Sequence, residues 1–155
     1  RMPKGGFFFD SIIRQQHFDE ERLNPEDNLE EFKPLTAIEI AEIADDVRAA
    51  HATGRYVVAG FGGTAFGDIA LVPAPFAKDP KGIRDVAEWY VSTRARRDYV
   101  HAIFDRQCEI ALENLAAIHA AVGDMPGALF LCGTDFGTQT STFCSTATFR
   151  ELWLP

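Results

Sequence analysis

The sequence predicts an α/β domain in which helices alternate with parallel β-strands. Two short runs, 56–61 and 128–132, are almost wholly apolar and lack the polar alternation of a half-exposed strand. An amphipathic helix precedes the first run, a long helical stretch separates the two, and another helix follows the second. This order of elements is typical of consecutive βα units. A chain of 155 residues is long enough for one such core.

Residues 1–35 are predicted to form an irregular leader, and residues 36–155 the βα units. Phe7, Phe8 and Phe9 open a β-prone run that suits an extended arm. The stretch from Asp19 to Glu31 is acidic, with one basic residue, and we interpret it as a solvated loop.

The first helix has a clear beginning and end. Thr36 stands three residues before Glu39, which is the spacing of a capping box. Gly54 lies where a left-handed C-terminal cap is expected. The apolar residues between them recur every three or four positions and predict one buried stripe. These residues are Ile40, Ile43, Ala44 and Val47.

The remaining elements follow in order. Run 56–61 is expected to be a strand buried on both faces, and a glycine-rich loop follows it. Residues 83–122 are predicted to form two helices broken near Arg97, and Gly123 ends the second. Run 128–132 repeats the buried-strand pattern and opens into a polar loop. Ser145 then has the character of an N-cap for a helix over 146–154.

Composition excludes several classes of protein. The formal charge is −8, with 23 acidic against 15 basic side chains, which argues against a nucleic-acid partner. No apolar run approaches the roughly 20 residues that cross a bilayer, so we expect no membrane association. The three cysteines are too few and scattered for a disulfide framework, and we interpret them as reduced thiols of a cytoplasmic protein.

Candidate site residues lie in the loops that follow the two strands, because such loops build the sites of parallel α/β folds. The first loop contains Phe61, Gly63 and Asp68, and the second contains Asp135 and Gln139. Asp135 directly follows a buried strand, where a carboxylate can act as a general base or bind a polar substrate group. The alternative is that Asp135 accepts hydrogen bonds from its own loop and shapes the turn. The sequence leaves both open.

Three other kinds of chemistry are disfavoured. Residues 60–65 match a dinucleotide-binding glycine pattern, but Pro73 and Pro75 prevent the long helix that must follow it. No C-x-x-C or H-x-C spacing appears, so we expect no metal to be bound by this segment alone. The serines lack a G-x-S-x-G elbow, which disfavours a serine nucleophile.

Three stretches resemble the uroporphyrinogen decarboxylase superfamily, a (β/α)8 TIM-barrel family that includes corrinoid-linked methyltransferases. They are residues 5–10, residues 59–66 and residues 132–139 continuing to 145–155. The last part is similar to the family's S-P-x-x-F-x-x-x-x-x-P segment, with Thr146 in place of the proline. The resemblance spans nearly the whole chain and implies the middle segment of the barrel.

Departures from the family pattern bear on the reaction. Leu71 stands where true decarboxylases have a tyrosine, and the D-x-G-x-Q pattern from Asp135 to Gln139 is closer to the methyltransferase branch. The resemblance therefore implies methyl transfer to or from a small-molecule substrate, with a corrinoid protein as partner. The alternatives are authentic uroporphyrinogen decarboxylation in haem biosynthesis, and a non-catalytic binding or assembly module.

On this hypothesis, Asp135 is the candidate catalytic residue, and Phe61, Gly63, Asp68 and Gln139 bind substrate. The segment itself is expected to bind no cofactor. The zinc ligands of the methyltransferase branch, an H-x-C and a final cysteine, would fall after Pro155, so zinc and corrinoid are expected only in a full-length parent.

The abrupt ends of the chain indicate a fragment. Two parallel strands do not make a stable sheet, and a closed barrel needs eight strands over about 250 residues. We expect the fragment alone to be inactive. Apolar faces exposed by cutting a barrel would favour a homo-oligomer or a partner.

Overall fold

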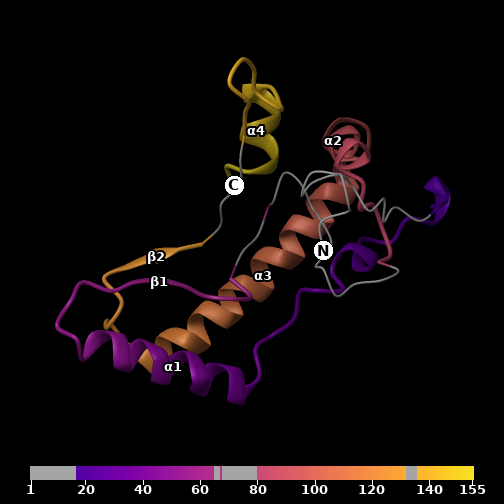
Figure 1. The fold of residues 1–155 in the computed structure, drawn as a ribbon. Helices are drawn as coiled ribbons and strands as arrows, with labels where there is room; N and C mark the ends of the chain where they lie inside the picture. Colours follow the sequence, from indigo (N-terminus) through magenta and orange to yellow (C-terminus); the bar gives the residue numbers. More distant parts are fainter. Residues whose placement is uncertain (1–16, 65–66, 68–79, 132–135) are drawn as a thin grey trace, which may run out of the picture.

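The computed structural model describes residues 17–64, 67, 80–131 and 136–155 (Figure 1). In this part of the chain the fold is mixed α/β, mostly helical, with a two-stranded parallel sheet, which confirms the predicted fold class at that level. The helices are η1 (Glu20–Arg22) and η2 (Pro25–Asn28), both 3-10, and α1 (Ala37–His51), α2 (Val86–Ala95), α3 (Arg97–Val122) and α4 (Thr146–Leu152). The strands are β1 (Val58–Gly60) and β2 (Ala128–Phe130).

The predicted capping box at the start of α1 is confirmed. The Glu39 backbone N–H donates to the Thr36 hydroxyl at 3.3 Å, and the Thr36 N–H donates to Glu39 Oε2 at 2.8 Å. These hydrogen bonds from Thr36 lower the pKa of the Glu39 carboxyl. The helix ends at His51, and Gly54 follows with a φ of 71°, so the left-handed residue lies beyond the cap residue Ala52.

The predicted break in the long helical stretch is also confirmed. Arg96 has a φ of −131° and a ψ of 50°, which separates α2 from α3 by a single non-helical residue. Its guanidinium bonds to Glu20 and Glu88, so a leader residue and an α2 residue both hold the break. Gly123 ends α3 with a φ of 58°. α4 begins after Ser145, which caps it by accepting from the Thr148 N–H at 3.1 Å.

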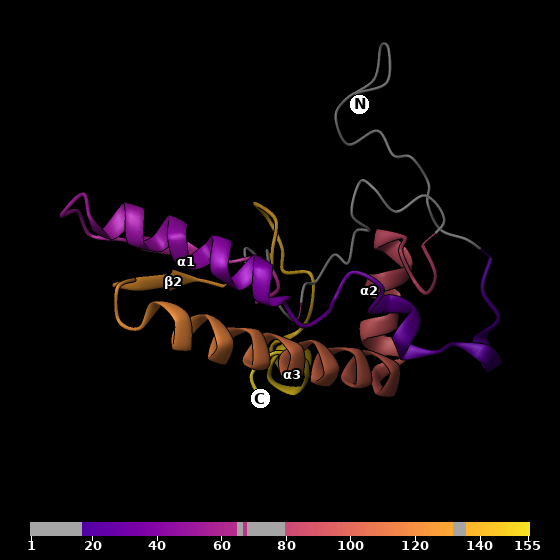
Figure 2. The same cartoon turned by 90° about the horizontal axis from the view of Figure 1, so that it is seen from below.

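The two strands pair in parallel, with Val58 opposite Ala128 and Gly60 opposite Phe130. The strands lie above α1 in Figure 1, and Figure 2, seen from below, shows α1 and α3 running alongside each other with β2 drawn between them. Ala59 faces the helices and is buried, whereas Val58 is 65% exposed and Phe130 62% exposed. The prediction that both faces of the strands are buried is therefore wrong for the described chain, because α1 and α3 cover the same side.

Helix α3 runs through two separate groups of buried apolar residues. Its first half packs with η2, α2 and α4, and its second half packs with α1. The first group consists of Leu29, Ile83, Trp89, Tyr99, Val100, Ile103, Phe104 and Leu152. The second consists of Ala44, Val47, Ile118 and Val122, with Phe61 and others packed against it. The single long helix therefore joins both cores.

The acidic leader is not simply a solvated loop, and that prediction is corrected here. Asn28 is 0% exposed, and Leu29 belongs to the first core. The Asn28 amide bonds both backbone groups of Ile83, at 2.8 Å each, and its Oδ1 accepts from the Tyr99 hydroxyl at 2.6 Å. Asn28 and Ile83 are 55 residues apart, so no local pattern in the sequence indicates this pairing.

The same leader covers a buried cation. The Arg84 guanidinium bonds Glu31 at 2.6 Å and the Asp27 carbonyl at 2.9 Å. Burial with this carboxylate neutralises a charge that would otherwise be costly to remove from water.

None of the helices in the described part is both long and apolar enough to span a bilayer.

Candidate functional site

The ends of β1 and β2 lie at the same edge of the sheet because the strands are parallel. The segments that follow them are therefore the candidate site, as predicted. Of the five predicted site residues, Phe61, Gly63 and Gln139 are described. Asp68 and Asp135 lie outside the described residues.

The segment after β1 turns sharply through its glycines. The Thr64 hydroxyl donates to the Phe61 carbonyl at 2.9 Å, and Gly63 has a φ of 75°. A Cβ at Gly63 would come 2.8 Å from Asn114 Nδ2, so this position needs glycine for both conformation and space. Gly67 repeats the left-handed conformation with a φ of 66°.

Two amide side chains of α3 form hydrogen bonds with the backbone of the segment after β1. Asn114 Nδ2 donates to the Gly63 carbonyl at 2.7 Å, and its Oδ1 accepts from the Leu35 N–H at 2.7 Å. Gln107 Oε1 accepts from the Gly67 N–H at 2.9 Å. Gln107 and Asn114 are seven residues apart, which puts them on one face of the helix, two turns from each other.

The segments after the two strands meet at Trp153, which follows α4. Its indole Nε1–H donates to the Gly67 carbonyl at 2.6 Å. The Phe136 ring, from the segment after β2, stands edge-on to the indole at a centroid distance of 5.3 Å. Phe104 of α3 completes the contact at 5.6 Å. We call Gly67, Phe104, Phe136 and Trp153 the Trp153 junction.

The described candidates take up different positions relative to this junction. Phe61 is half-buried and packs against the second core. Gln139 is exposed in the turn of a small antiparallel hairpin, whose bridge joins Gly137 and Thr142. The Thr138 N–H donates to the Ser141 carbonyl at 2.7 Å and closes that turn. Trp153, rather than a predicted residue, joins the two segments.

Cys144 lies between this hairpin and α4 and is a poor nucleophile. Its side chain is partly buried, and that burial raises the pKa of the thiol. The thiol therefore remains protonated at neutral pH, whereas the thiolate is the reactive form.

Within residues 17–64, 67, 80–131 and 136–155, no three histidine, cysteine, aspartate or glutamate residues gather closely enough to hold a metal ion.

Sequence reasoning missed Gln107, Asn114 and Trp153. The two amides occupy the apolar stripe of α3, where Ile103, Ile110 and Ile118 are buried. A polar residue in such a stripe must find a partner or leave a buried polar group unpaired. That interruption of the stripe is visible in the sequence, but the partners of the amides are not.

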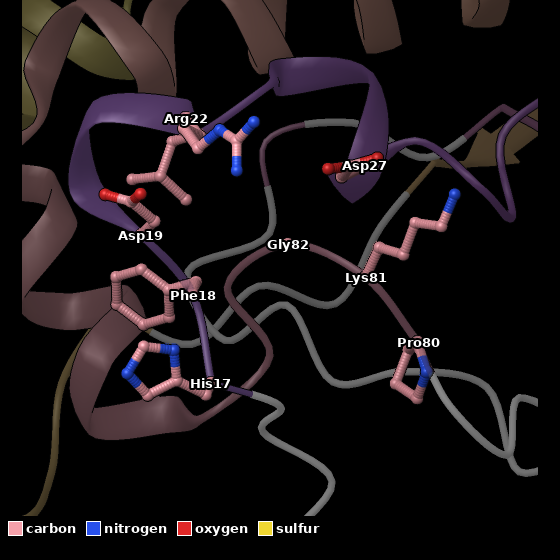
Figure 3. Close-up of a pocket in the computed structure, with 9 residues that line it drawn as sticks. His17, Phe18, Asp19, Arg22, Asp27, Pro80, Lys81 and Gly82 are labelled. Atoms are coloured by element: carbon pink, nitrogen blue, oxygen red, sulfur yellow. The ribbon is translucent and has the colours of Figure 1, made fainter.

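A separate hollow of about 250 Å³ lies between the leader and residues 80–82. Figure 3 shows the side chains of Arg22 and Asp27 extending toward each other, with Lys81 on the facing segment. Its charges have both signs, and neither Phe61, Gly63 nor Gln139 contributes to its wall. The complete lining is His17, Phe18, Asp19, Arg22, Leu23, Asp27, Pro80, Lys81 and Gly82.

Comparisons with protein-family models, curated proteins and solved structures find no match to this chain. Its function is therefore inferred from its residues and their geometry.

Proposed function

We propose that the chain is a βα segment of a barrel enzyme similar to the uroporphyrinogen decarboxylase superfamily, of the methyl-transferring branch. The observation that supports this proposal best is the arrangement around the sheet. β1 and β2 are parallel neighbours, and α1 and α3 lie on one side of them. The side chains of Val58 in β1 and Phe130 in β2 are exposed, and so is that of Tyr56 just before β1.

This arrangement favours a barrel over a doubly wound sheet. A doubly wound sheet is covered by helices on both faces. In a (β/α)8 barrel every helix lies outside, and bulky apolar side chains fill the interior. Val58 and Phe130 stand at register positions on the same face, since Val58 pairs with Ala128 and Gly60 with Phe130. They are the side chains that would face such an interior.

The proposed site lies at the carboxyl ends of the strands. Asp135 is its polar catalytic group, and Gln139 binds substrate beside it. Phe61 and Gly63 shape the other wall, with Asp68 a further substrate contact. The junction supports this assignment because it brings the two post-strand segments together. Leu71 in place of the decarboxylase tyrosine, and the D-x-G-x-Q pattern, favour methyl transfer.

The proposed reaction moves a methyl group between a corrinoid carried by a partner protein and a small-molecule acceptor. A corrinoid on the partner protein would supply the methyl group, and a thiol acceptor would have to lose its proton as the new carbon–sulfur bond forms. The thiol proton leaves to a base. A carboxylate such as Asp135 can accept that proton or orient the acceptor.

The test uses the protein expressed from its complete reading frame. Asp135→Ala is expected to lower turnover of methylcobalamin with a thiol by about a hundredfold or more, as loss of an acid–base group does. Its urea midpoint should stay close to that of the parent. Asp46→Ala, at an exposed position of α1, is the matched control and should change neither.

Two results would contradict the proposal. If Asp135→Ala lost stability and turnover to the same extent, the role of Asp135 would be to shape its loop. Conversion of uroporphyrinogen to coproporphyrinogen, without methyl transfer, would establish the decarboxylase alternative.

A second candidate is a non-catalytic assembly module, and the exposed apolar side chains favour it. Tyr56 is 74% exposed, and Val58 and Phe130 are also largely in contact with solvent. Such groups drive self-association or partner binding when they adjoin one another. Light scattering tests this candidate. Self-association that Phe130→Ser abolishes would support the assembly module, provided that the protein shows neither methyl transfer nor decarboxylation. A stable monomer would count against it.

A further inference from the structure

Gln107 is an uncharged polar residue on the buried face of α3, which apart from Gln107 and Asn114 is mainly apolar. It is 1% exposed, and its neighbours on that face belong to the core. A buried amide normally has all of its hydrogen-bonding groups paired. Only one of the two polar atoms of the Gln107 amide has a hydrogen-bond partner among the described residues, which is unusual for a buried amide.

The orientation of this amide is determined by its one partner. Oε1 accepts from the Gly67 N–H at 2.9 Å, and a reversed amide would put two N–H groups face to face. Nε2 is therefore the atom that is buried without a hydrogen-bond partner among the residues that the structure describes. An apolar side chain of the same length would avoid this unpaired donor. The acceptor oxygen is the only contribution of the amide that an apolar side chain cannot supply.

That oxygen acts on a glycine whose backbone N–H and carbonyl are both hydrogen-bonded. Gly67 donates its N–H to Gln107 of α3 and accepts the Trp153 Nε1–H after α4, at 2.6 Å. A Cβ at Gly67 would come 3.3 Å from the Trp153 ring, so the backbone approaches the indole closely. Two turns further along α3, Asn114 also holds the segment after β1, but with the opposite polarity, because its Nδ2 donates to the Gly63 carbonyl at 2.7 Å.

We infer that Gln107 is a positioning residue for the loop after β1. It holds Gly67 between α3 and Trp153, and with Asn114 it determines where the described residues of this loop, 61–64 and 67, lie. That these residues form a wall of the substrate site rests on the proposed function. The Gln107 side chain is polar at this buried position because its Oε1 positions the loop, although its Nε2 donor stays unpaired among the described residues.

The test compares Gln107→Met with Gln107→Glu in the protein from the complete reading frame. Methionine removes the acceptor and keeps the length of the side chain, whereas a carboxyl group keeps an acceptor for Gly67. In Gln107→Met, hydrogen exchange of the Gly67 amide should become about tenfold faster or more, while the Ile110 and Ile118 amides of α3 stay protected. Gln107→Glu should restore Gly67 protection to within about threefold of the parent.

A spectroscopic signal gives a second measurement. The Trp153 indole N–H resonance, assigned with Trp153→Phe, should move in Gln107→Met because its acceptor is the Gly67 carbonyl. The Trp89 indole resonance serves as the internal control. The matched control variant is Glu113→Met, at an exposed position of the same helix, which should change neither exchange nor resonance.

The outcomes separate this inference from the proposed function. Unchanged Gly67 exchange in Gln107→Met, or equally fast exchange throughout α3, overturns the positioning role whatever the activity. If Gln107→Met does not fold, failure of Gln107→Glu to protect Gly67 overturns it. If Gly67 exchange is altered in Gln107→Met, a KM raised about fivefold at nearly constant kcat supports the view that this loop forms a wall of the substrate site. An unchanged KM overturns that view. Absence of both enzyme activities defeats the proposed function alone.

Discussion

Replacing Asn28 with alanine should be among the most destabilising single changes in the described chain. The side chain is 0% exposed and makes three hydrogen bonds, two to the Ile83 backbone at 2.8 Å and one from the Tyr99 hydroxyl at 2.6 Å. Alanine would leave the N–H and the carbonyl of Ile83 without these partners. The Tyr99 hydroxyl would lose its short contact as well.

The expected magnitude follows from those three groups. A buried polar group left unpaired costs about 1–3 kcal/mol, and water or local movement recovers part of that loss. We therefore expect Asn28→Ala to lower the free energy of unfolding by about 3–5 kcal/mol, a large share of the stability of a small domain. Urea unfolding, followed by circular dichroism, measures this value.

Asn24→Ala is the matched control for this measurement. Asn24 is exposed and caps η2 by accepting from the Glu26 N–H at 3.2 Å, so its loss should cost about 0.5–1 kcal/mol. A loss in Asn28→Ala no larger than that of Asn24→Ala would refute the reasoning. It would mean that the leader does not hold residues 82–84 through this amide.

Two further predictions concern Gly63 and Tyr99. Gly63→Ala should cost about 1–3 kcal/mol in urea unfolding, because of its φ of 75° and the 2.8 Å approach to Asn114; Gly54→Ala, where φ is 71° and the space is open, should cost less. Burial raises the pKa of Tyr99 to about 12. The folded state then keeps a proton that the unfolded chain releases near pH 10, so the free energy of unfolding should fall between pH about 10 and about 12. Tyr99→Phe should flatten that decline, and an unchanged slope would contradict the assignment.

The elements that were predicted correctly are those whose signals are local. The bond between Thr36 and Glu39 spans three residues, and so does the cap of Ser145 on Thr148. A capping signal of this kind is complete in the sequence because both partners lie in the same turn. The break at Arg96 lies one residue before the expected Arg97, but no side-chain cap marks the start of α3 there.

The shared edge at which the two post-strand segments begin was predictable from the sequence, but the side chains that hold these segments were not. The parallel order of the strands implies that their following loops share one edge, and the pairing of β1 with β2 agrees. Phe61 is an apolar residue in a glycine-rich loop, and only packing reveals that it lies against the second core. Asp68 and Asp135 remain predictions, because they lie outside the described residues.

The leader shows why long-range partners escape sequence reasoning. Its acidic composition is typical of a solvated loop, yet Asn28 is buried through its bonds to Ile83. An asparagine in a turn has many available partners, and local sequence does not select among them.

By itself, the sequence determined where α1 and α4 begin, where α3 ends, and that two apolar strands alternate with the helices, since caps and periodicity act over a few residues. The start of α2 at Val86 and the helices η1 and η2 were not predicted. The tertiary structure decided which side of the strands is covered and which backbone groups the amides of α3 hold. Gln107 meets Gly67 across 40 residues and Asn114 meets Gly63 across 51. Such contacts exist only after α3 has docked, because docking and not chain proximity brings donor and acceptor within hydrogen-bonding distance.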